Sequence, residues 1–204
     1  MSTTQKSNPP VRSRGRPRAF DLEEALGKAQ GLFHARGYDA VSVADLTEAL
    51  GINPPSFYAA FGSKADLYSQ ALERYVRLEG LNFATLIAPD KPLAEGLAAV
   101  LHAAAANYSA NPQAPGCLVI EGARDTVDPA AGNNARAMWH KGRDELHRVI
   151  ARRDPDRAEA LTDYMIAVMA GLSSGARDGL SHERLHAIAQ MASAQLPMAL
   201  TTGS

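Results

Sequence analysis

The stretch SVADLTEALGINPPSFYAAFGSK, residues 42–64, decides the fold. Ser42 is a candidate N-cap for a short helix over residues 43–50, whose apolar side chains recur at helical spacing on one face. Gly51 ends this helix, and a second short apolar segment follows the turn. Two short helices joined by a glycine-containing turn are typical of a helix-turn-helix motif, although an ordinary corner between two core helices has the same pattern.

Pro54 and Pro55 lie where the second helix of this pair would begin. The first four N–H groups of a helix have no partner inside it, so a proline there gives up no hydrogen bond. Pro55 also disfavours α geometry at Pro54. We therefore expect Pro54 at the cap position and a helix over residues 55–61, with Asn53 as the alternative cap one residue earlier.

The second helix would present an uncharged, partly polar face. Phe57 and Phe61 can pack inward together, which leaves Ser56 and Tyr58 pointing outward. When such a helix enters the major groove of DNA, hydroxyl groups and lysine bind phosphates or base edges. Apolar surface suits the methyl group of thymine. The candidate DNA-contacting residues of this segment are therefore Pro54, Pro55, Ser56, Tyr58, Ala59 and Lys64.

Helical periodicity continues on both sides of the motif. Asp21 is a candidate N-cap, with Glu24 as its capping-box partner, for a helix over residues 21–36, and Ser63 begins a long helix after the motif. From Pro92 onward the pattern is helical, with breaks at proline, glycine and asparagine clusters. The predicted fold class is all-α, with further helices over residues 92–109, 116–126, 129–152, 156–177 and 182–198.

Composition limits the class of protein. The 204 residues, of which 46% are hydrophobic, can bury a sizeable core in one or two domains, and the low aromatic content favours closely packed helices. Cys117 is the single cysteine, so a disulfide within the chain is impossible. No signal-peptide pattern and no apolar run of membrane-spanning length is visible. We expect a cytoplasmic protein without a membrane partner.

Positive charge is concentrated at the N-terminus. The net charge is −1, yet residues 1–20 carry basic residues and no acidic one. Basic arms bind polyanions, and arginines on an arm can enter the narrow minor groove of DNA. A solubilising tail explains the same charge. We expect residues 1–19 to form a disordered basic arm, with Arg14 and Arg16 as its candidate DNA contacts.

The motif and its flanks resemble the DNA-binding domain of the TetR family of transcriptional regulators. The resemblance covers about a quarter of the chain, and its elements occur in the family's order and separation. The matching features are the end of the first helix from Phe33 to Tyr38, Ser42-Val43-x-Asp45-Leu46, Ala49-x-Gly51-Ile52, and Phe57-Tyr58-x-x-Phe61-x-Ser63-Lys64-x-x-Leu67.

This resemblance implies an organisation, a partner and an activity. It implies a three-helix DNA-binding domain over residues 20–66, and a helical bundle over residues 67–204 for ligand binding and dimerisation. It further implies a homodimer on a palindromic double-stranded DNA operator, acting as a repressor that a small-molecule effector releases. The family's DNA-contact positions fall on Ser42, Asn53, Pro54, Pro55, Ser56, Tyr58 and Lys64.

The sequence also departs from the family pattern. Family members often have Lys-Gly or similar small polar residues in place of Pro54-Pro55, and a bulkier polar residue in place of Ala59. A lysine or glycine backbone contact is therefore lost. Base reading would rely on Ser56, Asn53 and apolar contact.

The C-terminal half contains the candidate effector site. Residues 114–123 and 171–185 resemble a TetR branch with a Gly-Cys-Leu segment. An apolar cavity edged by aromatic and a few polar groups is the usual small-molecule site, although methionines and aromatics at helical spacing are also plain core. The candidate lining residues are Tyr108, Cys117, Met138, Trp139, Tyr164, Met165 and Met169.

Cys117 raises an alternative mode of regulation. It follows Gly116 at a predicted helix N-terminus, where the helix dipole favours a thiolate. A repressor that senses electrophiles or oxidants through this thiol is one interpretation, and a small buried residue is the other.

The last two long helices, over residues 156–177 and 182–198, would form the dimer interface in the family. Small residues on the first of them allow close approach of another helix, either within the chain or from a second copy: Ala167, Ala170, Gly171, Ser174 and Gly175.

Other chemistry finds little support in the sequence. His182 and His186, like His140 and His147, share helix faces, but no cysteine or third ligand accompanies them, so we expect no metal. No nucleophile elbow or phosphate-binding loop is present, so we expect neither an enzyme nor a cofactor. A helical interaction module that has lost DNA binding remains the other class, against which the intact motif and the arginine arm argue.

Overall fold

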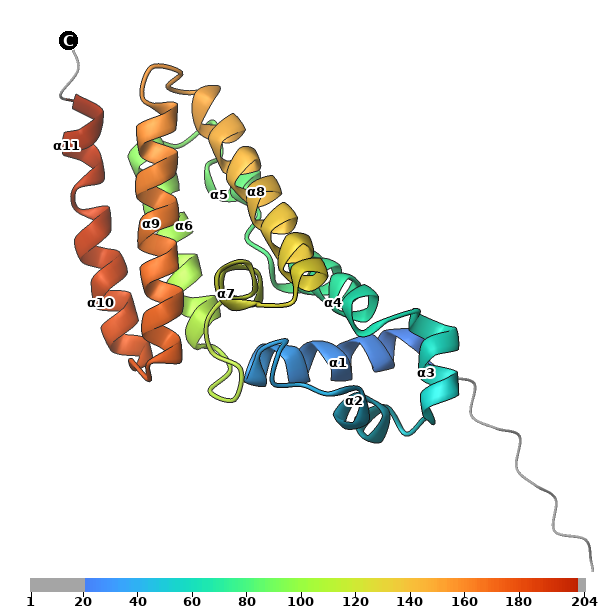
Figure 1. Ribbon diagram of the computed structural model, residues 1–204. Coiled ribbons are helices and arrows are strands. Elements are labelled where there is room, and N and C mark those ends of the chain that lie inside the picture. Colours follow the sequence, from blue (N-terminus) through green and yellow to red (C-terminus); the bar gives the residue numbers. More distant parts are fainter. Residues whose placement is uncertain (1–20, 202–204) are drawn as a thin grey trace, which may run out of the picture.

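The computed structural model describes residues 21–201, and within them the chain is helical throughout, so the all-α prediction is confirmed. Helices α1, α2 and α3 lie at one end, the bundle of later helices lies at the other, and α4 lies between them (Figure 1). In chain order the elements are α1 (Leu22–Arg36), α2 (Val43–Leu50), α3 (Pro54–Phe61), α4 (Lys64–Glu79), α5 (Phe83–Leu86), α6 (Leu93–Ser109), α7 (Leu118–Asp125), α8 (Pro129–Ala151), α9 (Ala158–Arg177), α10 (His182–Ser193) and α11 (Leu196–Thr201).

Helices α1, α2 and α3 form what we call the head, and side-chain caps fix where each begins. The Asp21 carboxylate accepts hydrogen bonds from the backbone N–H groups of Glu23 and Glu24. Ser42 and Asp45 form a reciprocal capping box at the start of α2. Each such cap contributes about 1 kcal/mol to helix stability. The short helices of the head therefore begin at positions that the sequence itself specifies.

The head has a small core that continues into α4. Phe33, Leu46 and Phe57 come from the three helices of the head and are fully buried. Burial of a side chain of this size stabilises the fold by about 1.5–3 kcal/mol. The Tyr68 ring of α4 packs edge-on against Phe33, with ring centroids 5.0 Å apart, and lies the same distance from Tyr38. The head and α4 thus share one aromatic cluster.

Helices α5 to α11 form what we call the body. Helix α10 packs along α6, α7 packs on α8, and α9 lies against both α6 and α8. Helix α4 contacts α1 on one side and α8 on the other, so it belongs to both parts of the molecule. A domain boundary between residues 66 and 67 would fall in the first turn of α4, and this division stays a prediction.

The helices predicted over residues 116–126 and 156–177 begin two residues later, at Leu118 and Ala158, and three further differences have a local cause. The helix predicted over residues 182–198 ends at Ser193, and α11 follows after a turn. The physical reason is Pro197, which has no N–H to donate to Ser193 and whose ring would clash with that carbonyl group. Helix α5 was not predicted, because four residues are too few to show a period. Helix α3 begins one residue earlier than expected, at Pro54.

Candidate functional site

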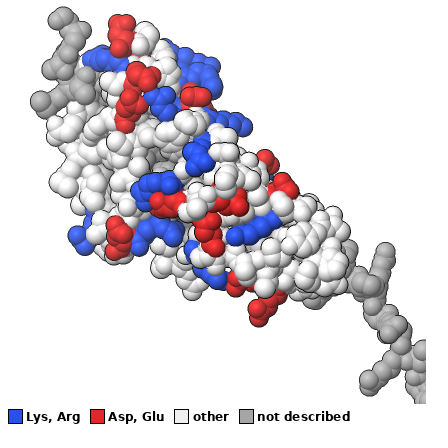
Figure 2. Space-filling view, viewed as in Figure 1, with Lys and Arg blue, Asp and Glu red and all other residues white. Residues whose placement is uncertain are grey.

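Helix α3 presents an exposed, uncharged face at the end of the head. Phe57 and Phe61 are buried as predicted, whereas Tyr58 is 52% exposed and Ser56 is also exposed. No residue of α3 carries a charge, and the surface at the α3 end is uncharged in the view shown (Figure 2). Contacts made by this face must therefore come from hydroxyl, amide and apolar groups.

Asn53, and not Pro54, caps α3, which is the alternative cap position considered above. The Asn53 Oδ1 atom accepts a hydrogen bond of 2.9 Å from the backbone N–H of Ser56. Asparagine is among the best N-cap residues, and a proline at the first helical position loses nothing. This hydrogen bond fixes the orientation of the first turn, where Pro54, Pro55 and Ser56 are all exposed.

Two further candidate DNA contacts already have partners in the protein. The Ser42 hydroxyl caps α2 through Asp45 and stays exposed. The Lys64 Nζ atom lies 3.9 Å from the centroid of the Tyr38 ring. Burial lowers the pKa of Lys64, while Asp39, Asp128 and Asp45 act in the opposite direction. Arg14 and Arg16 lie outside the described residues.

The body contains an apolar cavity of about 140 Å³ between α4, α6, α7, α8 and α9. Of the residues predicted to line an effector site, the structure brings together Tyr108, Cys117, Met138, Trp139 and Met169. Met165 is instead fully buried in the core, and the Tyr164 hydroxyl donates a hydrogen bond of 2.8 Å to the Ala192 carbonyl, away from this cavity. The remaining deep wall consists of Tyr75, Phe83, Val119, Ile120 and Ile166.

Sequence reasoning missed the contribution of α4 to this cavity. Tyr75 and Glu79 lie four residues apart on one face of α4 and both line the cavity. The sequence predicts a long helix that begins at Ser63, but the candidate lining residues include none from this helix. An aromatic residue following Leu72 on the same stripe was the signal that could have indicated it.

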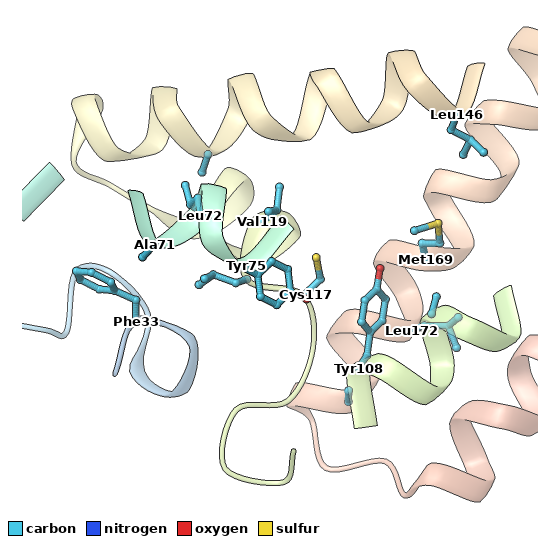
Figure 3. Packing of buried hydrophobic residues seen from close by; sticks show 14 of the residues in the cluster. Phe33, Ala71, Leu72, Tyr75, Tyr108, Cys117, Val119, Leu146, Met169 and Leu172 are labelled. Carbon is cyan, nitrogen blue, oxygen red and sulfur yellow. The ribbon is translucent and has the colours of Figure 1, made fainter. Parts of the chain in front are cut away.

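Three polar groups lie at the inner end of the cavity. The figure shows the Tyr108 hydroxyl and the Cys117 sulfur pointing toward the same space, near the Tyr75 ring (Figure 3). Tyr75, Tyr108 and Cys117 all line this cavity. The two hydroxyls lower the pKa of the Cys117 thiol, but burial has the larger, opposite effect. Burial raises the pKa of each tyrosine well above its usual value. All three groups are therefore uncharged at neutral pH.

The thiol of Cys117 is less acidic than its place at the start of α7 predicted. Hydrogen bonds from the backbone N–H groups of Ile120 and Val119 favour a thiolate, as expected at a helix N-terminus. Burial is the larger effect, however, and raises the pKa of the thiol. The structure therefore does not favour Cys117 as a reactive sensor.

Hydrogen bonds connect the cavity wall to the head. The His34 Nε2 atom, near the end of α1, lies 3.1 Å from the carbonyl oxygen of Gly116, the residue before Cys117. Arg177 of α9 donates to the carbonyl oxygens of both His34 and Pro115. The His34 ring also packs edge-on against Tyr75, with centroids 5.3 Å apart. The cavity wall and α1 are thus in direct contact.

His34 makes the stability of this connection depend on pH. Burial lowers its pKa from 6.5, opposed by the hydrogen bond to Gly116 and by Glu79, while Arg177 lowers it further. The unfolded chain therefore binds a proton on His34 more readily than the folded chain does. The contribution of neutral His34 to the free energy of unfolding is therefore present above about pH 6.5 and is lost as the pH falls below that value.

We expect the melting temperature of the protein to fall more steeply between pH 7 and pH 5 than that of the His34→Gln variant. Glutamine can still donate a hydrogen bond to Gly116 but does not titrate. Thermal unfolding followed by circular dichroism over this range measures the difference. Parallel curves for the two proteins would contradict a neutral, buried His34.

Three histidines meet between α6 and α10, a grouping that sequence spacing did not reveal. The His102 ring lies 4.7 Å from that of His186, which in turn lies 6.1 Å from that of His182. Burial lowers the pKa of His102, and its Nδ1 atom is buried without a hydrogen-bond partner.

Within residues 21–201, no group of three or more histidine, cysteine or acidic residues has an arrangement that could hold a metal ion. A search of the same residues finds no helix with the length and hydropathy needed to cross a membrane.

Comparison with known proteins places this arrangement in a family. The sequence model for "Bacterial regulatory proteins, tetR family" matches residues 26–71, which include the helix-turn-helix motif. The HTH-type transcriptional repressor BdcR of Escherichia coli K12 is 47% identical over 192 residues, covering 94% of this chain and 95% of BdcR. The repressor ComR of the same organism is 32% identical over 189 residues, covering 87% of this chain and 90% of ComR.

A solved structure has the same fold over most of its length. A cysteine variant of the TetR family regulator CifR, complexed with 26-bp double-strand operator DNA, superposes with a TM-score of 0.75 at 34% identity. The match covers 88% of this chain and 98% of that one. With a full-length relative at 47% identity and a family match over the motif, the chain belongs to the TetR family of bacterial regulatory proteins.

Proposed function

We propose that this protein is a transcriptional repressor that binds an operator through α3 and leaves it when a small molecule occupies the cavity in the body. The observation that carries this function is the exposed face of α3, held in a fixed orientation by the Asn53 cap and by the buried Phe57 and Phe61. The names of BdcR and ComR as repressors, and the operator complex of CifR, support the same function. These three relatives give no support to an enzymatic function.

The candidate DNA-contacting residues have different roles in this proposal. Asn53 and Ser56, in the first turn of α3, face base edges, since recognition helices use their N-terminal residues for that purpose. Tyr58 and Lys64 bind phosphates and so position the head without reading sequence. Pro54 and Pro55 supply apolar surface for thymine methyl groups. Arg14 and Arg16 add contacts in the minor groove.

The homodimer would form through α9 and α10. Ala167 and Gly171 are exposed on α9, and a Cβ atom added to Gly171 would meet nothing within 4 Å. Met191 on α10 is 64% exposed. Gly175, in contrast, packs within the chain, because a Cβ atom there would lie 2.8 Å from Leu180 Cδ1. Exposed small residues on α9 and an exposed large apolar side chain on α10 suit a second copy of these helices.

Release of DNA would follow from the connection between cavity and head. A ligand that pushes on Tyr75 or on the segment before α7 displaces the His34 contact, and with it α1. A ligand weakens DNA binding only to the extent that it binds the released conformation more tightly than the DNA-bound one. The thiol alternative is not favoured, because burial keeps Cys117 protonated.

Selection of bound fragments from a genomic DNA library tests this function. We expect the protein to enrich a small set of fragments that share an inverted repeat, with an affinity that falls steeply as salt concentration rises. The position of the enriched fragments would also indicate the regulated gene. Recovery of no sequence-selective, salt-sensitive fragment would rule out the regulator function.

A further inference from the structure

The wall of the cavity limits which molecules it can hold. Its charged residues lie at the rim, where Glu79, Lys141 and Glu145 are exposed to solvent. Arg143 is already paired with acidic residues of α9, at 2.5 Å from Glu159 and 2.8 Å from Asp163. No unpaired charge therefore reaches the deep wall, and a charged ligand would lose its hydration without gaining a counter-ion.

The deep wall offers mainly hydrogen-bond donors to a ligand. Apart from the hydroxyls of Tyr75 and Tyr108, the thiol of Cys117 and the indole N–H of Trp139, its side chains present apolar groups. The only acceptor beside these hydroxyls in the deep wall is the Cys117 sulfur, which is a weak one. A ligand oxygen placed between them would accept a stronger hydrogen bond than the thiol does.

The size of the cavity sets the size of the ligand. An apolar protein cavity of roughly 150 Å³ holds one benzene molecule. The cavity here measures about 140 Å³, so its enclosed part accommodates one ring with a small substituent. Trp139 and Met138 of α8 and Met169 of α9 supply flat and adaptable surface for such a ring.

We propose that the effector of this protein is a neutral, largely apolar molecule of single-ring size with one oxygen acceptor, which the Tyr75 and Tyr108 hydroxyls bind. This inference rests on the proposed function, because it specifies the ligand of the cavity assigned there. The ligand oxygen accepts hydrogen bonds from the two hydroxyls, for which the deep wall itself offers only the weak thiol acceptor. It thereby pushes on Tyr75 of α4, whose ring contacts His34 of the head.

A matched series of three probes tests the chemical class. Acetophenone has a ring and an oxygen acceptor, ethylbenzene lacks the acceptor, and benzoate is charged. Trp139 is the single tryptophan, so its indole N–H gives one resonance in the spectrum of ¹⁵N-labelled protein and reports directly on the cavity. We expect acetophenone to shift this resonance saturably, with a Kd about fivefold to tenfold lower than that of ethylbenzene, and benzoate to leave it unmoved.

Removal of the two hydroxyls tests whether they bind the ligand oxygen. In the Tyr75→Phe/Tyr108→Phe variant, acetophenone should bind no more tightly than ethylbenzene, whose own Kd stays within about twofold of its wild-type value. If the double variant does not fold, the Tyr108→Phe variant is tested alone. It should lose half or more of the wild-type preference for acetophenone over ethylbenzene. Equal binding of acetophenone and ethylbenzene by the wild type, or binding of benzoate, would overturn the proposal.

DNA binding is measured separately, so that the two proposals fail in different ways. If acetophenone binds as expected but leaves the affinity for a selected genomic fragment unchanged, the ligand class stands and the release mechanism fails. If the protein binds DNA selectively and benzoate alone shifts the Trp139 resonance, the ligand class fails and the regulator function stands.

Discussion

The Ser56→Glu variant is expected to bind operator DNA at least on the order of 100-fold more weakly than the wild type, because like charges brought together at an interface cost several kcal/mol. Ser56 is exposed in the first turn of α3, three residues after the Asn53 cap. A glutamate there would bring a carboxylate into the groove, close to the negative charge of the DNA. The same position favours an acidic residue within the helix itself, because the helix dipole and the capping box both stabilise it. Thermal stability should therefore be unchanged or slightly higher.

Gel-shift titration of a selected fragment, together with a thermal melt, measures both quantities. Arg148→Gln is the matched control, since it changes the net charge by the same one unit at an exposed site near the end of α8. We expect the control to bind DNA within about twofold of the wild type, because screened charges far from the interface contribute little. Equal weakening in both variants would mean that α3 does not face the DNA.

The Gly122→Ala variant should destabilise the protein by about 1–3 kcal/mol, despite the usual preference of helices for alanine. A Cβ atom at Gly122 would lie 2.1 Å from the Tyr68 hydroxyl oxygen and 3.2 Å from Ala135 Cβ. Tyr68 is 1% exposed, and its ring is held by Phe33 of the head, so it cannot yield easily. For a protein of this size, each 1 kcal/mol lowers the melting temperature by roughly 2–4 °C.

Gly31→Ala is the matched control for this substitution. Gly31 is also inside a helix, but a Cβ atom there would meet nothing within 4 Å. This change should stabilise the protein by up to about 1 kcal/mol, through helix propensity alone. If thermal melts show that both variants are stabilised alike, the contact between α7 and Tyr68 is looser than the structure indicates.

Most of the head could be predicted from the sequence because its signals are local. The Ser42 N-cap, the Gly51 turn and the inward pair Phe57 and Phe61 each depend on residues within a few positions of one another. The start of α3 was predicted one residue late. The restriction that Pro55 places on Pro54 is small, and the hydrogen bond between Asn53 and Ser56 outweighs it.

The cavity could be predicted only in part because it depends on packing between distant segments. Met165 and Met169 lie on the same helix and have the same chemistry, yet one is fully buried in the core and the other lines the cavity. Residue type does not separate these two environments. The roles of Tyr75 and His34 could not be predicted from the sequence. They depend on how α4 and α1 approach Gly116, which no local pattern encodes.

A footprint on a selected genomic fragment tests the central claim, that the head reads DNA and that two copies do so together. We predict two protected segments related by an inverted repeat, with centres separated by about one helical turn of DNA, roughly 10 bp, or a multiple of it. Both segments should disappear together in the Ser56→Glu variant. A single protected segment, or protection that persists in that variant, would contradict the account.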